Sequence, residues 1–165
     1  MNISSLLLVA AALTIAPASA PRVDAAQQDR LDGVQSLMCT FPVYATGTWS
    51  NGEPKAELKP SALALRFDAI NTDEGTARMS VVESPRAPRN GGFVVSHIIV
   101  RRSLGALHLI QAWDAGPLYV TTVFDLESRP GKRQAVHTRH EYISMPLPMY
   151  TSRPEQYYGE CEARR

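Results

Sequence analysis

The sequence carries almost no net charge and none of the short motifs that mark common enzyme classes. Its 165 residues include 17 lysines and arginines against 16 aspartates and glutamates, a formal charge of +1 at pH 7. Binding to nucleic acids or acidic surfaces depends on an excess of cationic side chains, so the composition gives no electrostatic reason to expect such partners. The patterns G-x-S-x-G, H-E-x-x-H and the phosphate loop are absent. We therefore predict one globular domain without an evident catalytic residue set and without a cofactor.

Long hydrophobic runs are also missing, apart from one near the N-terminus. Residues 6–15 are apolar and uncharged but too short to span a bilayer comfortably, and small residues follow in Ala16-Pro-Ala-Ser-Ala20. This arrangement predicts a secretory signal peptide over residues 1–20 and a secreted or periplasmic protein, with the cleavage site open between Ala18 and Ala25. The alternative is a buried N-terminal helix. No later segment is long and apolar enough to form a transmembrane helix.

Cysteine is scarce, since the chain contains only Cys39 and Cys161. They are far apart and form no C-x-x-C motif, which makes redox catalysis a weak alternative. In the oxidising compartment that the signal peptide implies, two cysteines most simply form one disulfide. The sequence thus predicts a bond that joins the start of the folded region to its end.

Most of the chain reads as strands and turns, and we assign residues 39–165 to a single β domain. Leu63, Leu65, Phe67 and Ala69 alternate with more polar residues, as in a half-buried strand. Further strands are predicted over about 76–82, 93–101, 106–113, 118–126 and 133–144. Residues 21–38 are a polar segment with a short amphipathic helix, in which Val34 and Leu37 would share a face, and the tail from Met145 should be irregular. The predicted fold is all-β, an antiparallel meander forming a small up-and-down barrel or a strongly curved sheet.

Short turns allow the last four predicted strands to be aligned, because short connections imply antiparallel neighbours. Hairpins symmetric about their turns give four cross-strand rows on one concave face. The rows are Val100–Leu107–Phe124–Val136, Ile98–Leu109–Thr122–Thr138, Ser96–Gln111–Val120–His140 and Val94–Trp113–Leu118–Tyr142. The opposite face then carries His97, Arg101, His108, Thr121, Asp125, His137, Arg139 and Glu141 together with Val95, Ile99, Ile110 and Val123. That outer face is too apolar for full solvation, so we expect the N-terminal segment, the tail or a second subunit to cover it.

The segment Thr46-Gly-Thr-Trp-Ser-Asn-Gly52 resembles the G-x-W signature of the first strand in calycin-type barrels, the lipocalin and avidin-like group. The resemblance implies a meandering antiparallel barrel, open at one end, that holds a small ligand. Gly47 and Trp49 match the two signature positions, and Trp49 would belong to the barrel core and plug its closed end. The alternative is that Trp49 is simply a core aromatic residue near a turn.

The candidate ligand site is the third row of the concave face, where polar side chains interrupt an apolar surface. It comprises Ser96, Gln111 and His140, flanked by the aromatic residues Trp113 and Tyr142. Buried polar groups need hydrogen-bond partners, so a cluster among aromatic residues suits a pocket that orients a small-molecule ligand. Alternatively, these side chains bond to one another or to ordered water at the mouth of a barrel.

Two other functions stay open. The outer face, with Ile110 near its centre, could serve a protein–protein interaction module or a homodimer. A hydrolase using Ser96 and His140 is conceivable, but Gln111 and Val120 lie between them. A metal site is not expected from His137 and His140, because residues three apart on a strand point to opposite faces. The sequence therefore favours a binding or accessory protein over an enzyme.

Overall fold

The computed structural model describes residues 31–83, 94–112, 117–144 and 150–164. The predicted signal peptide and residues 21–30 of the predicted N-terminal segment lie outside these ranges. Residues 31–35 contain a turn, and the first strand begins at Ser36, so Leu37 belongs to a strand and not to a helix.

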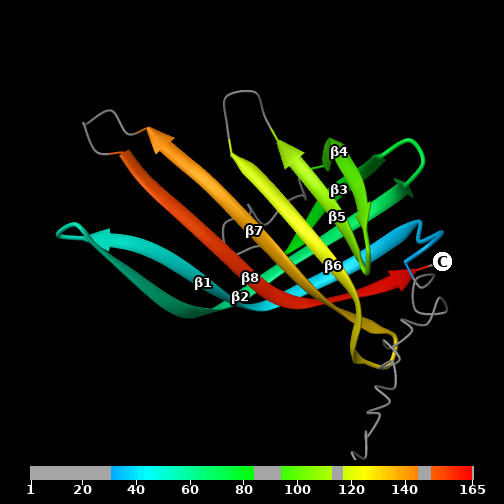
Figure 1. Ribbon diagram of the computed structural model, residues 1–165, viewed down its shortest axis with the longest axis horizontal. Coiled ribbons are helices and arrows are strands. Elements are labelled where there is room, and N and C mark those ends of the chain that lie inside the picture. Colours follow the sequence, from blue (N-terminus) through cyan, green and yellow to red (C-terminus); the bar gives the residue numbers. More distant parts are fainter. Residues whose placement is uncertain (1–30, 84–93, 113–116, 145–149, 165) are drawn as a thin grey trace, which may run out of the picture.

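Eight antiparallel strands form one closed barrel in chain order (Figure 1). They are β1 (Ser36–Ser50), β2 (Glu53–Asn71), β3 (Thr76–Glu83), β4 (Val94–Ser103), β5 (Ala106–Ala112), β6 (Leu118–Arg129), β7 (Lys132–Ser144) and β8 (Tyr150–Arg164). Each strand pairs with the next, and β8 pairs with β1 to close the ring. The predicted all-β meander is therefore confirmed. Of the two forms that we predicted, the structure has the closed barrel and not the open curved sheet. No helix in the described ranges is suited to crossing a membrane.

The tail is the largest error in the predicted strands. We expected an irregular segment from Met145, but β8 occupies Tyr150–Arg164 and has a partner on each side. Proline and glycine in this segment made it read as a loop. Pairing with both β1 and β7 overrides that local preference, since it satisfies backbone groups on both edges of the strand.

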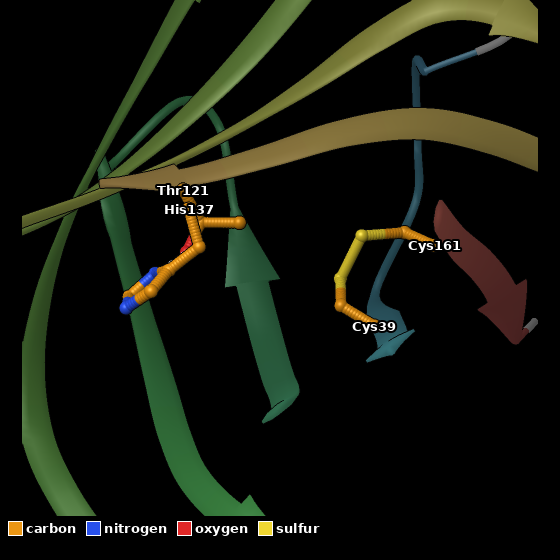
Figure 2. The surroundings of a disulfide bond; sticks show 4 residues. All are labelled: Cys39, Thr121, His137 and Cys161. Carbon is orange, nitrogen blue, oxygen red and sulfur yellow. Dashed lines mark hydrogen bonds between the residues drawn. A yellow bond between two sulfur atoms is a disulfide. The ribbon is translucent and has the colours of Figure 1, made fainter. Parts of the chain in front are cut away.

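The disulfide prediction is confirmed, because Cys39 of β1 and Cys161 of β8 are bonded across a sequence separation of 122 (Figure 2). Both side chains are fully buried. They lie in an apolar core that gathers inner side chains from the two ends of the chain and from the middle strands. Its largest fully buried members are Leu37, Phe41, Leu65, Phe67, Val100, Leu107, Leu109 and Val123. The bond therefore lies at the seam where the barrel closes.

Two long hairpins, β1–β2 and β7–β8, project beyond the ends of the other strands (Figure 1). The β1–β2 turn is Asn51-Gly52, with φ angles of 55° and 82°. Two successive positive φ values define the turn type that matches the right-handed twist of a hairpin. β3 pairs with β2 only from Ala64 onward, so residues 53–60 lie beyond that ladder and are all exposed.

The predicted faces are correct for β4 and β5, although the predicted pairs are offset by two residues, since Val100 lies opposite Leu109 and not opposite Leu107. The predicted faces of β6 and β7 are inverted. The pair Ala112–Leu118 leaves residues 113–117 in the connection, whereas we had placed Trp113 opposite Leu118. One more loop residue shifts the register by one, and a shift of one exchanges the two faces of a strand. Thr121, Val123 and His137 are therefore buried inside the barrel, while Thr122, Phe124 and Val136 lie on the other face.

A smaller correction concerns β2, where Leu63, Leu65 and Phe67 are buried as predicted but Ala69 is exposed. The register of β2 against β3 shifts between Asp68 and Asn71, and Ala69 has a φ of 51°. This bulge lets Ile70 replace Ala69 on the inner face.

Candidate functional site

Polar and aromatic side chains line part of the barrel interior, on the strands β5 to β8. We name as the polar interior cluster the residues Gln111, Tyr119, Thr121, His137, Arg139, Glu155 and Tyr157. Cross-strand pairing places them in two adjacent rows. One row is Gln111–Tyr119–Arg139–Glu155, and the other contains Thr121–His137–Tyr157. Directly paired residues share a face of the sheet, so the register alone brings these side chains together.

Glu155 holds one end of the cluster and is only 4% exposed. The Tyr157 hydroxyl donates a hydrogen bond of 2.6 Å to Glu155 Oε2, and Arg139 Nη1 lies 3.5 Å from the same oxygen. Burial, together with the bond to Glu155, raises the pKa of Tyr157 to about 12. The phenol therefore stays protonated at neutral pH and remains a donor. The Arg139 guanidinium also lies 5.1 Å from the centre of the Tyr119 ring, a cation–π contact.

His137 lies in an aromatic environment inside the barrel (Figure 2 shows it beside Thr121). Its Nδ1 is 2.8 Å from Thr121 Oγ1, and the rings of Phe41 and Tyr157 each lie 5.7 Å away, centre to centre. Desolvation, and secondarily the positive charge of Arg139, lowers the pKa of His137 to about 3. The imidazole is therefore neutral at physiological pH.

Gln111 is the unusual member of the cluster. Its side chain is 97% buried, and neither its amide nitrogen nor its amide oxygen has a hydrogen-bond partner in the described part of the chain. Leaving a buried polar group without a partner costs about 1–3 kcal/mol. An apolar side chain of similar size would avoid that cost. The arrangement therefore suits an amide that receives its partner from a bound molecule.

Apolar residues form the remaining inner surface, on β2, β3 and β4. Leu63, Leu65, Met79 and Ile98 are all buried members of the core. A molecule inside this barrel would thus meet hydrogen-bonding and aromatic groups from four strands and aliphatic groups from the other inner strands. Such a division suits a ligand with one polar group and an apolar remainder.

The predicted ligand site is not assembled as we expected. Gln111 points into the barrel, but His140 is exposed and follows Arg139, which shares the row of Gln111, so the two side chains lie on opposite faces. The backbones of Ser96 and Tyr142 lie in β4 and β7, whereas their side chains are outside the described set, as is all of Trp113. Only Gln111 is retained in the candidate site.

Arg139, His137 and Thr121 were assigned to the outer face because of the shifted register, and Glu155 and Tyr157 fell in the tail that read as irregular. The signal for the last two is their spacing of two, which places both on one face once the segment is a strand. Nothing in the sequence distinguishes the two faces of β6, because Val120 and Phe124 are as apolar as Val123.

Trp49 does not fill the closed end of the barrel or any other part of its core. It lies near the tip of the projecting β1–β2 hairpin, opposite Pro54, and is 61% exposed. The expected role of Trp49 is therefore wrong. The resemblance of its segment to calycin-type barrels stays a prediction.

A depression of about 510 Å³ lies away from the polar interior cluster, over β1, β2 and β8. Its charged side chains form ion pairs with one another, because Arg129 and Lys132 both donate hydrogen bonds to the carboxylate of Glu160. These hydrogen bonds lower the pKa of Glu160 to about 2. Among the described residues, no three histidine, cysteine or acidic side chains are placed to share a metal ion.

The fold and site define a disulfide-closed, eight-stranded antiparallel barrel with a partly polar interior. Searches of protein-family models, curated proteins and solved structures returned no match to this chain.

The buried His137 predicts a loss of stability in mild acid. In the unfolded chain its pKa returns to 6.5, so below that pH the unfolded state binds a proton that the folded state, with a pKa of about 3, does not. Stability from this group is complete above pH 6.5 and falls as the pH decreases toward 3. Between pH 7.5 and pH 5 the free energy of unfolding should decrease by about 2 kcal/mol.

Denaturant unfolding at several pH values measures this effect. The His137→Asn variant, which keeps a polar group beside Thr121, should show a flatter dependence over the same interval. As a matched control, the His140→Asn variant, changed at an exposed position, should show the same pH dependence of the free energy of unfolding as the wild type. Equal slopes for the wild type and the His137→Asn variant would show that His137 is not a buried neutral base.

Proposed function

We propose that this protein binds a small, uncharged, partly apolar molecule inside the barrel, at the polar interior cluster. The observation that supports this most directly is the buried Gln111 amide, whose donor and acceptor both lack a partner among the described residues. A ligand group that offers an acceptor and a donor, such as an amide or a hydroxyl, would meet that need.

The charge balance of the cluster favours an uncharged ligand. Arg139 and Glu155 are within ion-pair distance, His137 is neutral, and the Tyr157 phenol keeps its proton. The cluster thus has no surplus charge. Burying an ion beside it would cost free energy that no opposite charge offsets.

We further propose that the protein is exported and acts as a binding or accessory protein and not as an enzyme. The disulfide is compatible with an oxidising extracellular or periplasmic location. The cluster contains no nucleophile paired with a base of matched pKa. The imidazole of His137 contacts the hydroxyl of Thr121, but its pKa is lowered to about 3, far below the ordinary value for histidine. The hydrolase alternative also loses the predicted site, because exposed His140 faces away from the barrel interior.

The Gln111→Leu variant tests this function because it changes stability and binding in opposite directions. Removing an unpaired buried amide should raise the free energy of unfolding of the ligand-free protein by about 1–3 kcal/mol. It should also weaken binding of N-phenyl-1-naphthylamine, an uncharged apolar fluorophore with one N–H donor. Denaturant unfolding and fluorescence titration measure the two effects.

The matched control is Gln134→Leu, which makes the same replacement at an exposed position of β7. It should change neither binding nor stability by more than about 0.5 kcal/mol. Probe binding that is equal in the wild type and Gln111→Leu would refute the assignment of the site. Native mass spectrometry of protein purified from its own compartment would identify any retained ligand.

A protein–protein module on the outer face is the second candidate. Ile99, Ile110 and Val120 form one cross-strand row there, and Ile99 is 44% exposed. A dimer that dissociates on Ile110→Lys, with the fold retained, would favour this function. The interior site is preferred because it contains a buried group that needs a partner, whereas nothing in the structure shows what covers the outer row.

A further inference from the structure

Within the described parts of the chain, no strand pairs with the outer edge of β2 over the projecting hairpin. Residues 53–60 pair with β1 on one side, whereas β3 joins the other side only from Ala64 onward. All side chains from Glu53 to Pro60 are exposed, and Leu58 is 73% exposed. In Figure 1 this part of the hairpin extends away from β3 to β6. An unpaired edge of this kind is a template for another strand.

The turn decides which backbone groups face that edge. In a two-residue hairpin the flanking residues, here Ser50 and Glu53, hydrogen-bond to each other. Alternate residues from Pro54 onward therefore direct their backbone groups away from β1. Proline has no N–H, so the donors on this stretch of edge belong to Ala56 and Leu58. The edge is thus short, with a proline at each end.

The side chains along the same stretch alternate in charge. Glu53, Lys55, Glu57 and Lys59 share one face of the hairpin, and Pro54, Ala56, Leu58 and Pro60 share the other. An antiparallel copy of this strand, related by a twofold axis at Ala56, would place Lys55 opposite Glu57 and Glu53 opposite Lys59. On the second face Pro54 would meet Leu58. Opposite charges and apolar groups therefore match on both faces in one register.

We propose that this edge pairs with the same edge of a second copy of the chain, with the twofold axis at Ala56. The Ala56 N–H of each copy donates to the Ala56 carbonyl of the other. The Leu58 N–H of each copy donates to the Pro54 carbonyl of the other. Such an interface is isologous and closes as a dimer. The prolines limit the ladder to the residues between them, and because the same edge of each copy is used, that edge is not left open for a third copy.

Charge excludes the nearest alternative register. An axis one residue further along, at Glu57, places Glu57 against its own copy and Lys55 against Lys59, and like charges directly opposite each other are destabilising. An axis at Leu58 places Lys55 opposite Ser61 and leaves it without a carboxylate. The axis at Leu58 still places Glu57 opposite Lys59, so Lys55 is the residue that distinguishes the proposed register from both others: Lys55→Glu creates repulsion across the interface only when the axis lies at Ala56.

A charge-swap experiment on the full, disulfide-bonded chain tests the proposal. Because the ladder is short, the wild type should dimerise weakly, which analytical ultracentrifugation detects at high protein concentration. Lys55→Glu and Glu57→Lys should each weaken self-association about tenfold or more, since each turns attractive contacts into repulsive ones. An equimolar mixture of the two variants should dimerise again, because each supplies the charge that the other lacks.

Controls separate this edge from other surfaces. Ala56→Pro, which removes the donor at the axis, should abolish dimerisation, whereas Ile110→Lys on the outer face should leave it unchanged. Circular dichroism and thermal unfolding verify that each variant is folded. A monomeric wild type at high concentration, an Ile110-dependent dimer, or a mixture that fails to associate while the wild type does would each overturn the proposal.

Discussion

Replacing both cysteines by alanine is expected to lower the free energy of unfolding by roughly 4–5 kcal/mol, the value for closing a loop of on the order of 100 residues. The reason is that Cys39 and Cys161 lie 122 residues apart, so the bond strongly restricts the unfolded chain. In the native barrel, the backbone pairing of β1 with β8 holds the same two positions together without it. We therefore expect the double variant to fold with the same strand pairing but reduced stability.

Denaturant titration or calorimetry measures this change, and the melting temperature should fall by more than about 10 °C. Reduction of the wild type provides the control, because it should produce nearly the same loss, while the double alanine variant should be insensitive to reductant. A loss below about 1 kcal/mol would mean that the unfolded chain already keeps its ends together.

Gly159→Ala is expected to be the most damaging single substitution in the β1–β8 seam. Gly159 lies opposite a bulge in β1, where the register shifts between Thr40 and Val43. A Cβ atom at Gly159 would lie 2.8 Å from the Cα of Phe41 and closer still to the Thr40 carbonyl oxygen. These are backbone atoms, so the clash cannot be relieved by a side-chain rotation. The loss should be about 3 kcal/mol or more, at the upper end for overpacking.

Gly47→Ala supplies the matched control, since Gly47 also lies in a strand and has no positive φ. An added Cβ there would lie 3.3 Å from the Cγ of the Pro154 side chain, which has more freedom to move. Its stability should change by less than about 1 kcal/mol. Equal unfolding midpoints for the two variants would show that the β1 bulge does not need a bare backbone opposite it.

The elements that were predicted correctly are those with strong local signals. Alternating apolar residues located β3 to β7, and glycine or proline in the turns separated them. The last strand, β8, was harder to predict, because it contains Pro154 and Gly159 and is identified as a strand only by its pairing with β7 and the distant β1. The bulge at Ala69 in β2 was equally invisible, since a left-handed residue is not expected at alanine.

The candidate site was predicted only in part, and the register explains the difference. Gln111 is inside because Leu107 and Leu109 define the inner face of β5 without ambiguity. After the loop 113–117, both faces of β6 carry apolar residues, so the sequence pattern does not show which face of β6 points into the barrel. His137 and Arg139 therefore exchanged places with His140 in our prediction. The inversion passed on to β7. The predicted pairing of Phe124 with Val136 was itself wrong by two residues, since Val136 lies opposite Thr122, but a shift of two leaves the faces unchanged.

By itself, the sequence determined the class of fold and the pairing of the two cysteines. Periodicity and turn residues are local properties of the chain, and with two cysteines only one intrachain disulfide is possible. Only the tertiary structure decided which side chains face the interior. That choice depends on ring closure between β1 and β8 and on the length of one loop. In a closed barrel every strand must be in register with two neighbours at once. This requirement places Glu155, Tyr157, Arg139 and His137 on the same interior face as the Gln111 amide, which has no hydrogen-bond partner among the described residues.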